Sequence, residues 1–137
     1  MGALVVLHCD NHVLAVAKPA GQPTVPDESG DLSLFDVAKE WVRVEFGKPG
    51  QAWLGVVHRL DRPVSGVVCF ARTSKAAARL SASLRSGECR KLYWGVTEAG
   101  PLAQSGELEQ WLVKDEAKNR VRVVGGPGAG ARLARTR

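Results

Sequence analysis

The chain has 137 residues, of which 45% are hydrophobic, enough for one domain with a packed core. No apolar run reaches the length of a membrane span and no leader pattern opens the chain, so we expect a cytoplasmic protein without membrane contact. The net charge of +5 suits a polyanionic partner, since cationic side chains that bind phosphates release counterions. Three cysteines lie far apart without a C-x-x-C pair, which favours reduced thiols over disulfides or a metal site.

The first third of the chain predicts a hairpin, a loop and a helix. Residues 4–9 and 12–18 read as two strands joined by a turn at Asp10-Asn11. Prolines and glycines make the segment that follows an irregular loop. A helix is expected over about 33–46, capped by Asp31 or Ser33. Its apolar residues recur with helical spacing and should face the core: Leu34, Val37, Ala38, Trp41 and Val42.

The middle of the chain predicts two strands around a strongly charged turn. Apolar runs flank His58-Arg59-Leu60-Asp61-Arg62-Pro63-Val64-Ser65-Gly66, so strand, turn and strand are expected over about 54–72. Asp61 therefore leaves the end of a strand and enters the turn, where a rigid scaffold can present it to solvent or substrate. Its carboxylate can act as a nucleophile or a general base, with Arg59 and Arg62 keeping it ionised. The alternative is a structural Arg-Asp turn in which Asp61 caps backbone N–H groups.

The remaining elements predict an α+β protein. A second helix begins at Thr73 or Ser74 and ends near Arg85, with Gly87 as its stop. Alternation predicts a strand over 89–98, and 108–113 with 120–124 form a further hairpin. Residues 125–130 are a glycine-rich loop. The expected fold is a mixed, largely antiparallel sheet with two interspersed helices.

Four segments in register resemble the RluA-type RNA pseudouridine synthases. The stretch 58–66 is similar to the active-site motif of that family, and Ala17-Lys18-Pro19-Ala20-Gly21 to its lysine-proline-x-glycine turn. Arg72-Thr73-Ser74-Lys75-Ala76 resembles the start of the helix after the motif strand, and Arg90-Lys91-Leu92-Tyr93-Trp94-Gly95-Val96 its Lys-x-Tyr strand. The resemblance covers about residues 4–124.

The resemblance implies a role for each candidate residue. Asp61 would be the catalytic carboxylate, and Tyr93 would stack on a flipped uracil. Arg59 would fill the vacated stack or contact phosphate, and Arg62 would also bind substrate. Lys91 should point to the same face of the strand as Tyr93 and bind substrate by a contact with phosphate, or meet Asp61 instead. By contrast, His58 should pack. Lys18 is expected to be a solvated lysine, with a contact to RNA as the alternative. The reaction uses no metal and no cofactor, and the partner is ribosomal or transfer RNA.

The expected organisation is a catalytic domain over 1–124 followed by a glycine-rich loop and a basic strand over 125–137. Nothing matches the Gly-Arg-Thr-His-Gln-Ile-Arg-like segment with which the family's domain continues, so the resemblance implies a C-terminally truncated domain. Three hypotheses follow: an active RNA pseudouridine synthase, a catalytically inactive relic that still binds RNA, or a cofactor-free hydrolase that uses Asp61 as a base. The oligomeric state, the particular RNA and the uridine are not encoded in any visible pattern.

Overall fold

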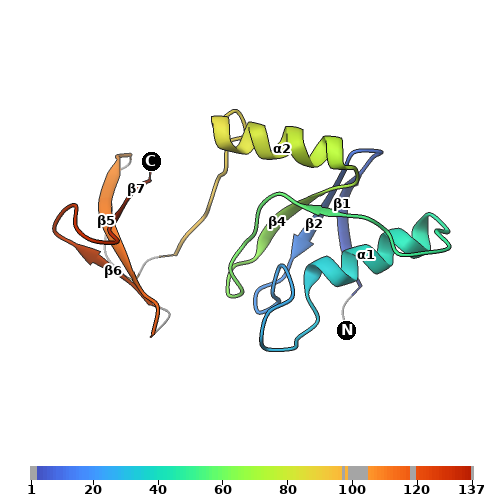
Figure 1. The fold of residues 1–137 in the computed structure, drawn as a ribbon, viewed down its shortest axis with the longest axis horizontal. Coiled ribbons are helices and arrows are strands. Elements are labelled where there is room, and N and C mark those ends of the chain that lie inside the picture. Colours follow the sequence, from blue (N-terminus) through green and yellow to red (C-terminus); the bar gives the residue numbers. More distant parts are fainter. Residues whose placement is uncertain (1–2, 97, 99–104, 118–119, 137) are drawn as a thin grey trace. The chain divides into compact units, whose positions relative to one another are not determined.

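A computed structural model describes residues 3–96, 98, 105–117 and 120–136, which fall into two compact units, Met1–Leu92 and Tyr93–Arg137 (Figure 1). Two helices and four strands belong to the first unit: β1 Val5–Cys9, β2 Val13–Lys18, α1 Leu34–Glu45, β3 Gly55–Val56, β4 Gly66–Ala71 and α2 Ser74–Ser86. Three strands form the second: β5 Leu108–Asp115, β6 Arg120–Val124 and β7 Arg132–Thr136. The expected α+β class is confirmed.

The first unit is built on an antiparallel sheet in the order β1-β2-β4-β3. The predicted hairpin of β1 and β2 is confirmed, and the Asp10 carboxylate accepts the N–H groups of His12 and Val13 at 2.7 Å each in its turn. Alternate residues of β2 and β4 point to one face, where Leu14, Val16, Val68 and Phe70 are fully buried. This face carries the core of the unit.

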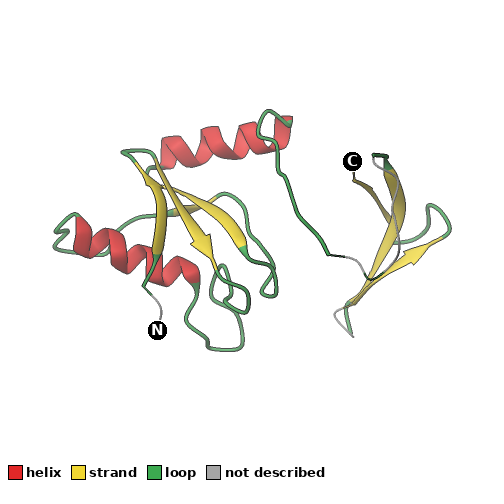
Figure 2. Cartoon of the chain, turned by 180° about the vertical axis from the view of Figure 1, so that it is seen from behind, coloured by secondary structure: helices red, strands yellow, loops and turns green. Residues whose placement is uncertain are grey.

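Helix α1 covers that core, as its apolar stripe predicts. Ser33 caps the helix, since its hydroxyl accepts the N–H of Asp36 at 3.2 Å. The stripe places Leu34, Ala38 and Val42 in the core. Figure 2 shows the strands of this unit lying between the two helices.

Helix α2 packs against β4 and β3 with small side chains. Thr73 caps its start and Gly87 ends it in the left-handed conformation, both as expected. A Cβ on Gly55 would lie 2.8 Å from the Trp53 ring and 3.1 Å from the Cβ of Ala77, so the close approach of β3 to α2 requires glycine.

The second unit is a three-stranded antiparallel sheet in the order β6-β5-β7. The predicted hairpin of residues 108–113 and 120–124 is confirmed, and the glycine-rich segment after it is a loop. The division of the chain at residue 124 stays a prediction.

Two predicted strands differ from the structure. The predicted strand over 89–98 is wrong: residues 88–96 and 98 carry no strand, while residue 97 lies outside the described residues. The alternation of apolar and polar residues in this segment suits a paired β-strand. In the described part of the chain, however, no strand pairs with the segment, and Trp94 is fully exposed. The strand before the motif is also shorter than expected, with a ladder only at Gly55–Val56.

Candidate active site

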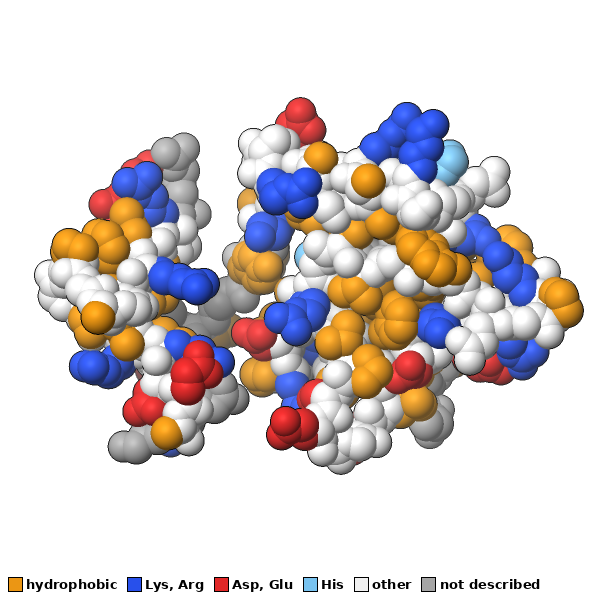
Figure 3. Space-filling model, viewed as in Figure 1, with side chains coloured by type: hydrophobic (Ala, Val, Ile, Leu, Met, Phe, Trp, Pro, Cys, Tyr) orange, Lys and Arg blue, Asp and Glu red, His pale blue; other side chains and the backbone are white. Residues whose placement is uncertain are grey.

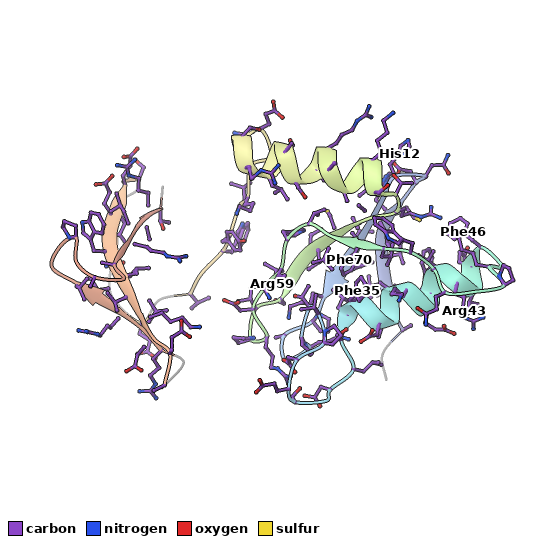
Figure 4. The ribbon with its side chains drawn as sticks, viewed as in Figure 1. His12, Phe35, Arg43, Phe46, Arg59 and Phe70 are labelled. Atoms are coloured by element: carbon purple, nitrogen blue, oxygen red, sulfur yellow. The ribbon has the colours of Figure 1, made fainter. Side chains whose placement is uncertain are left out.

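The candidate site is the loop of residues 57–65 between β3 and β4, here called the motif loop. Asp61 and Arg59 are exposed on it. Figure 4 labels Arg59 on this loop. The carbonyl of Asp61 accepts the N–H of Val64 at 3.0 Å and closes a turn. Its carboxylate has neither a hydrogen bond nor an ion pair with any described residue. It therefore does not cap backbone N–H groups, which was the alternative role for this residue, and is open to solvent.

The two residues that flank Asp61 are bound to the loop of residues 19–33 between β2 and α1, here called the β2–α1 loop. The buried hydroxyl of Thr24 donates to the carbonyl of Leu60 at 2.6 Å and accepts its N–H at 3.2 Å. On the other side, the carbonyl of Arg62 accepts the N–H of Gly21 at 2.7 Å. The backbone is fixed before and after Asp61 while the carboxylate is free, which is the arrangement that a preorganised reactive group requires.

Lys18 completes this attachment from the end of β2. Its side chain is only 2% exposed, and its ammonium donates to the carbonyls of Pro19 at 3.0 Å, Gln22 at 2.7 Å and Arg62 at 3.1 Å. Three donated bonds use all three ammonium hydrogens. Burial lowers the pKa of Lys18 below its ordinary value, and the negative charge of Asp61 opposes that shift.

The expectation that Lys18 is solvated is therefore wrong. Lys18 continues the alternation of Leu14 and Val16 on β2, so its side chain enters the core-facing row. This period-2 signal was available in the sequence. It was missed because lysine is rarely fully buried without partners, and the partners here are backbone carbonyls that no residue pattern displays.

Arg62 is also part of this attachment. Its guanidinium forms ion pairs with Asp27 at 3.0 Å and Asp31 at 2.5 Å, and also donates to the hydroxyl of Ser29. Hydrogen bonds from Ser29 and Arg62 lower the pKa of Asp27 to about 2. Hydrogen bonds to the same two carboxylates raise the pKa of Arg62. The guanidinium is thus directed at the β2–α1 loop rather than at Asp61.

Backbone geometry explains why glycine occupies two positions of these motifs. Gly21 has φ +88°, a left-handed conformation that lets its N–H reach Arg62. Gly66 has φ +150°, and a Cβ there would lie 3.2 Å from Cδ1 of Leu60. Both positions disfavour a side chain, and both lie where the motif loop meets its supports.

His58, near the start of the motif loop, packs its ring against β4, as its alternation with Arg59 predicts. Its half-buried ring accepts the N–H of Cys69 on Nε2 at 2.9 Å, so a neutral imidazole carries its proton on Nδ1. Burial lowers the pKa of His58, and the positive charge of Lys91 lowers it further. Lys91 is therefore within electrostatic reach of this side of the motif strand.

The candidate residues fall into both units. Asp61, Arg59, Arg62 and Lys91 belong to the first unit. Tyr93 begins the second unit, is 65% exposed and lies outside any strand. The expectation that Lys91 and Tyr93 share one face of a strand is wrong, because no strand forms there.

The described residues give little support for a metal site, a disulfide or a second ligand site. They contain no group of His, Cys, Asp or Glu side chains arranged to hold a metal ion. The three cysteines are free thiols; Cys89 is exposed, whereas Cys9 and Cys69 are half-buried. A cavity of about 460 Å³ lies beside Lys18 between β1 and the start of α1, but its lining is mostly apolar and excludes Asp61. No described helix is long and apolar enough to cross a bilayer.

Comparison with known proteins adds the family. Residues 12–137 match the family model described as RNA pseudouridylate synthase. The chain is 35% identical over 109 residues to an uncharacterised RNA pseudouridine synthase of Zymomonas mobilis, covering 80% of the chain and 48% of that relative. It is 33% identical over 115 residues to the dual-specificity RNA pseudouridine synthase RluA of Escherichia coli, covering 82% of the chain and 48% of that relative. The chain thus spans about half the length of these relatives.

A solved structure has the same fold. The human RNA pseudouridylate synthase domain containing 4 superposes with a TM-score of 0.76 at 23% identity, covering 96% of this chain and 51% of that protein. This likeness concerns the fold alone.

Replacing Lys18 by methionine should destabilise the protein by about 2 kcal/mol or more, because the carbonyls of Pro19, Gln22 and Arg62 lose a charged donor. Urea unfolding followed by circular dichroism measures the change. Lys75→Met, at an exposed position of α2, should change the free energy of unfolding by less than about 0.5 kcal/mol. Equal effects of the two substitutions would refute the structural role of Lys18.

The lowered pKa of His58 predicts a pH-dependent stability. The folded state binds the proton less tightly than the unfolded chain, so this stabilisation is fully present above the ordinary pKa of 6.5 and is lost as the pH falls below it. We expect the wild type to lose more thermal stability than His58→Gln between about pH 7.5 and about pH 5. Parallel melting curves for the two proteins across that range would show that the ring titrates normally.

Proposed function

Because the chain belongs to the RNA pseudouridylate synthase family, we propose that it isomerises uridine to pseudouridine in RNA with Asp61 as the catalytic carboxylate. The observation that carries the proposal is the attachment of the motif loop on both sides of Asp61. The Leu60 and Arg62 carbonyls are held by Thr24, Gly21 and Lys18, while the carboxylate is exposed and has no partner among the described residues.

The chemistry needs one ionised carboxylate next to a ribose. The bond between C1′ and N1 of uracil breaks, and a bond between C1′ and C5 forms after the base has rotated. The hydrogen on C5 leaves to solvent and N1 gains a proton, so no redox partner, metal or cofactor is consumed. Asp61 acts either by attack on C1′ or as a base towards a ribose proton, and both roles need the same exposed carboxylate.

The remaining candidates are proposed to bind the substrate. Arg59 is exposed and forms no ion pair or hydrogen bond within the described chain, so its guanidinium is available to fill the gap left by a flipped base or to contact phosphate. Tyr93 is proposed to stack on the flipped uracil, and Lys91 to contact phosphate. Arg62 is proposed to contribute positive potential while it remains paired with Asp27 and Asp31.

The substrate class extends this proposal. We take ribosomal or transfer RNA as the substrate, as the family resemblance implies, and the cytoplasm as the location.

A second candidate function is RNA binding without catalysis. The observation that favours it is the exposure of the segment that carries Tyr93. Leu92 is 88% exposed and Trp94 fully exposed, so the described residues do not pack around this segment to fix a stacking ring.

One assay separates the two candidates. RNA containing uridine tritiated at C5 should release tritium with the wild type, and Asp61→Asn should reduce the release by about 100-fold or more, since the amide neither attacks nor accepts a proton. Glu28→Gln, which neutralises another exposed carboxylate, should leave the rate unchanged. Release that persists in Asp61→Asn would exclude Asp61 as the catalytic group. Tight RNA binding with no release by the wild type would support the second candidate.

A further inference from the structure

Helix α2 carries positive charge without any negative charge. Lys75, Arg79 and Arg85 are its charged residues, and no acidic residue occurs between Ser74 and Ser86. The other helix of the same unit differs, because α1 contains Asp36, Glu40 and Glu45 as well as two cations. Of the two helices of this unit, α2 alone therefore carries a net positive charge.

The three cationic side chains of α2 are exposed and have no ion-pair partner among the described residues. The structure gives none of them an ion pair or side-chain hydrogen bond with a described residue. On α1, by comparison, Arg43 pairs with Glu40 at 2.6 Å and Lys39 donates to Gln51 at 3.2 Å. Cations that have no ion-pair partner can bind a polyanion without first breaking an ion pair.

The exposed residues between these cations have small side chains. Lys75 and Arg79 are four residues apart and therefore neighbours on the helix surface. The other exposed positions of the helix are Ser74, Ala78, Ala82 and Ser86. A surface of long cationic side chains with short residues between them lets a phosphate backbone approach the helix closely. A protein partner would instead need large apolar or aromatic anchors, and the exposed side of α2 has none.

This surface begins one strand away from the motif loop. Strand β4 leads from the motif loop to the start of α2, and α2 runs back in the opposite direction (Figure 1). A strand of 6 residues and a helix of 13 each span about 20 Å, so the cations are distributed over several nucleotide lengths. Figure 3 shows blue side chains on the edge where Figure 1 places α2.

We propose that the exposed face of α2, formed by Lys75, Arg79 and Arg85, binds the phosphate backbone of the RNA outside the target nucleotide. This inference rests on the proposed function, because it assigns RNA as the partner. Contacts to phosphates position an RNA without reading its sequence. The face would increase affinity for the substrate and leave the chemical step to the motif loop.

The test compares two double variants that remove two cations with the same spacing from the two helices. Lys75→Gln/Arg79→Gln should weaken binding of a uridine-containing RNA stem-loop by about tenfold and reduce the slope of log K against log salt by about 1 to 2. Lys39→Gln/Arg43→Gln should change neither by more than about twofold. Fluorescence anisotropy at several salt concentrations measures both quantities, and tritium release from the same RNA is followed in parallel.

The outcomes separate this inference from the proposed function. Equal RNA affinity and salt dependence of the two variants would overturn the role of α2, while tritium release by the wild type would still support the enzyme. Selective weakening by Lys75→Gln/Arg79→Gln without tritium release by the wild type would support the binding face and refute the catalytic proposal. A selective rise in KM at unchanged kcat would support both.

Discussion

The buried ammonium of Lys18 joins the end of β2, the loop that follows it and the motif loop, and the geometry of the candidate site depends on this contact. A lysine at 2% exposure costs free energy unless its charge is compensated, and here three carbonyls and the nearby charge of Asp61 provide compensation. One of those carbonyls belongs to Arg62, the residue after Asp61. The cost of burying the charge is thus offset by contacts that also fix the backbone on which the proposed catalytic residue stands.

The two arginines of the motif have different roles where the motif loop meets the β2–α1 loop. Arg62 is bound to Asp27 and Asp31 and so fixes the β2–α1 loop against the motif loop, whereas Arg59 is exposed. The two arginines are therefore not equivalent: Arg62 is part of the scaffold, and Arg59 is available to a polyanion. With α2, this gives a proposed division of labour in which the motif loop carries the chemistry and a helical face binds the backbone of the RNA.

Much of the first unit could be predicted from the sequence because local patterns and tertiary contacts agree there. The apolar stripe of α1, its Ser33 cap and the hairpin at Asp10 all follow from short-range rules. The placement of Asp61 in an exposed turn after a strand also followed from pattern. The burial of Lys18 and the pairing of Arg62 with Asp27 and Asp31 did not, since both depend on contacts between segments about 30 to 45 residues apart. The segment 89–98 shows the opposite failure: its alternation predicts a strand, but a strand needs a paired neighbour that no local pattern supplies.

Hydrogen exchange at the Gly21 amide tests the attachment of the motif loop most directly, because this N–H is donated to the carbonyl of Arg62 at 2.7 Å. If the two loops are joined as described, this amide exchanges far more slowly than an unprotected amide, although Gly21 lies on an exposed loop. Exchange of Gly21 at the rate of an unstructured peptide would show that the motif loop is not held, and the account of a preorganised Asp61 would fail.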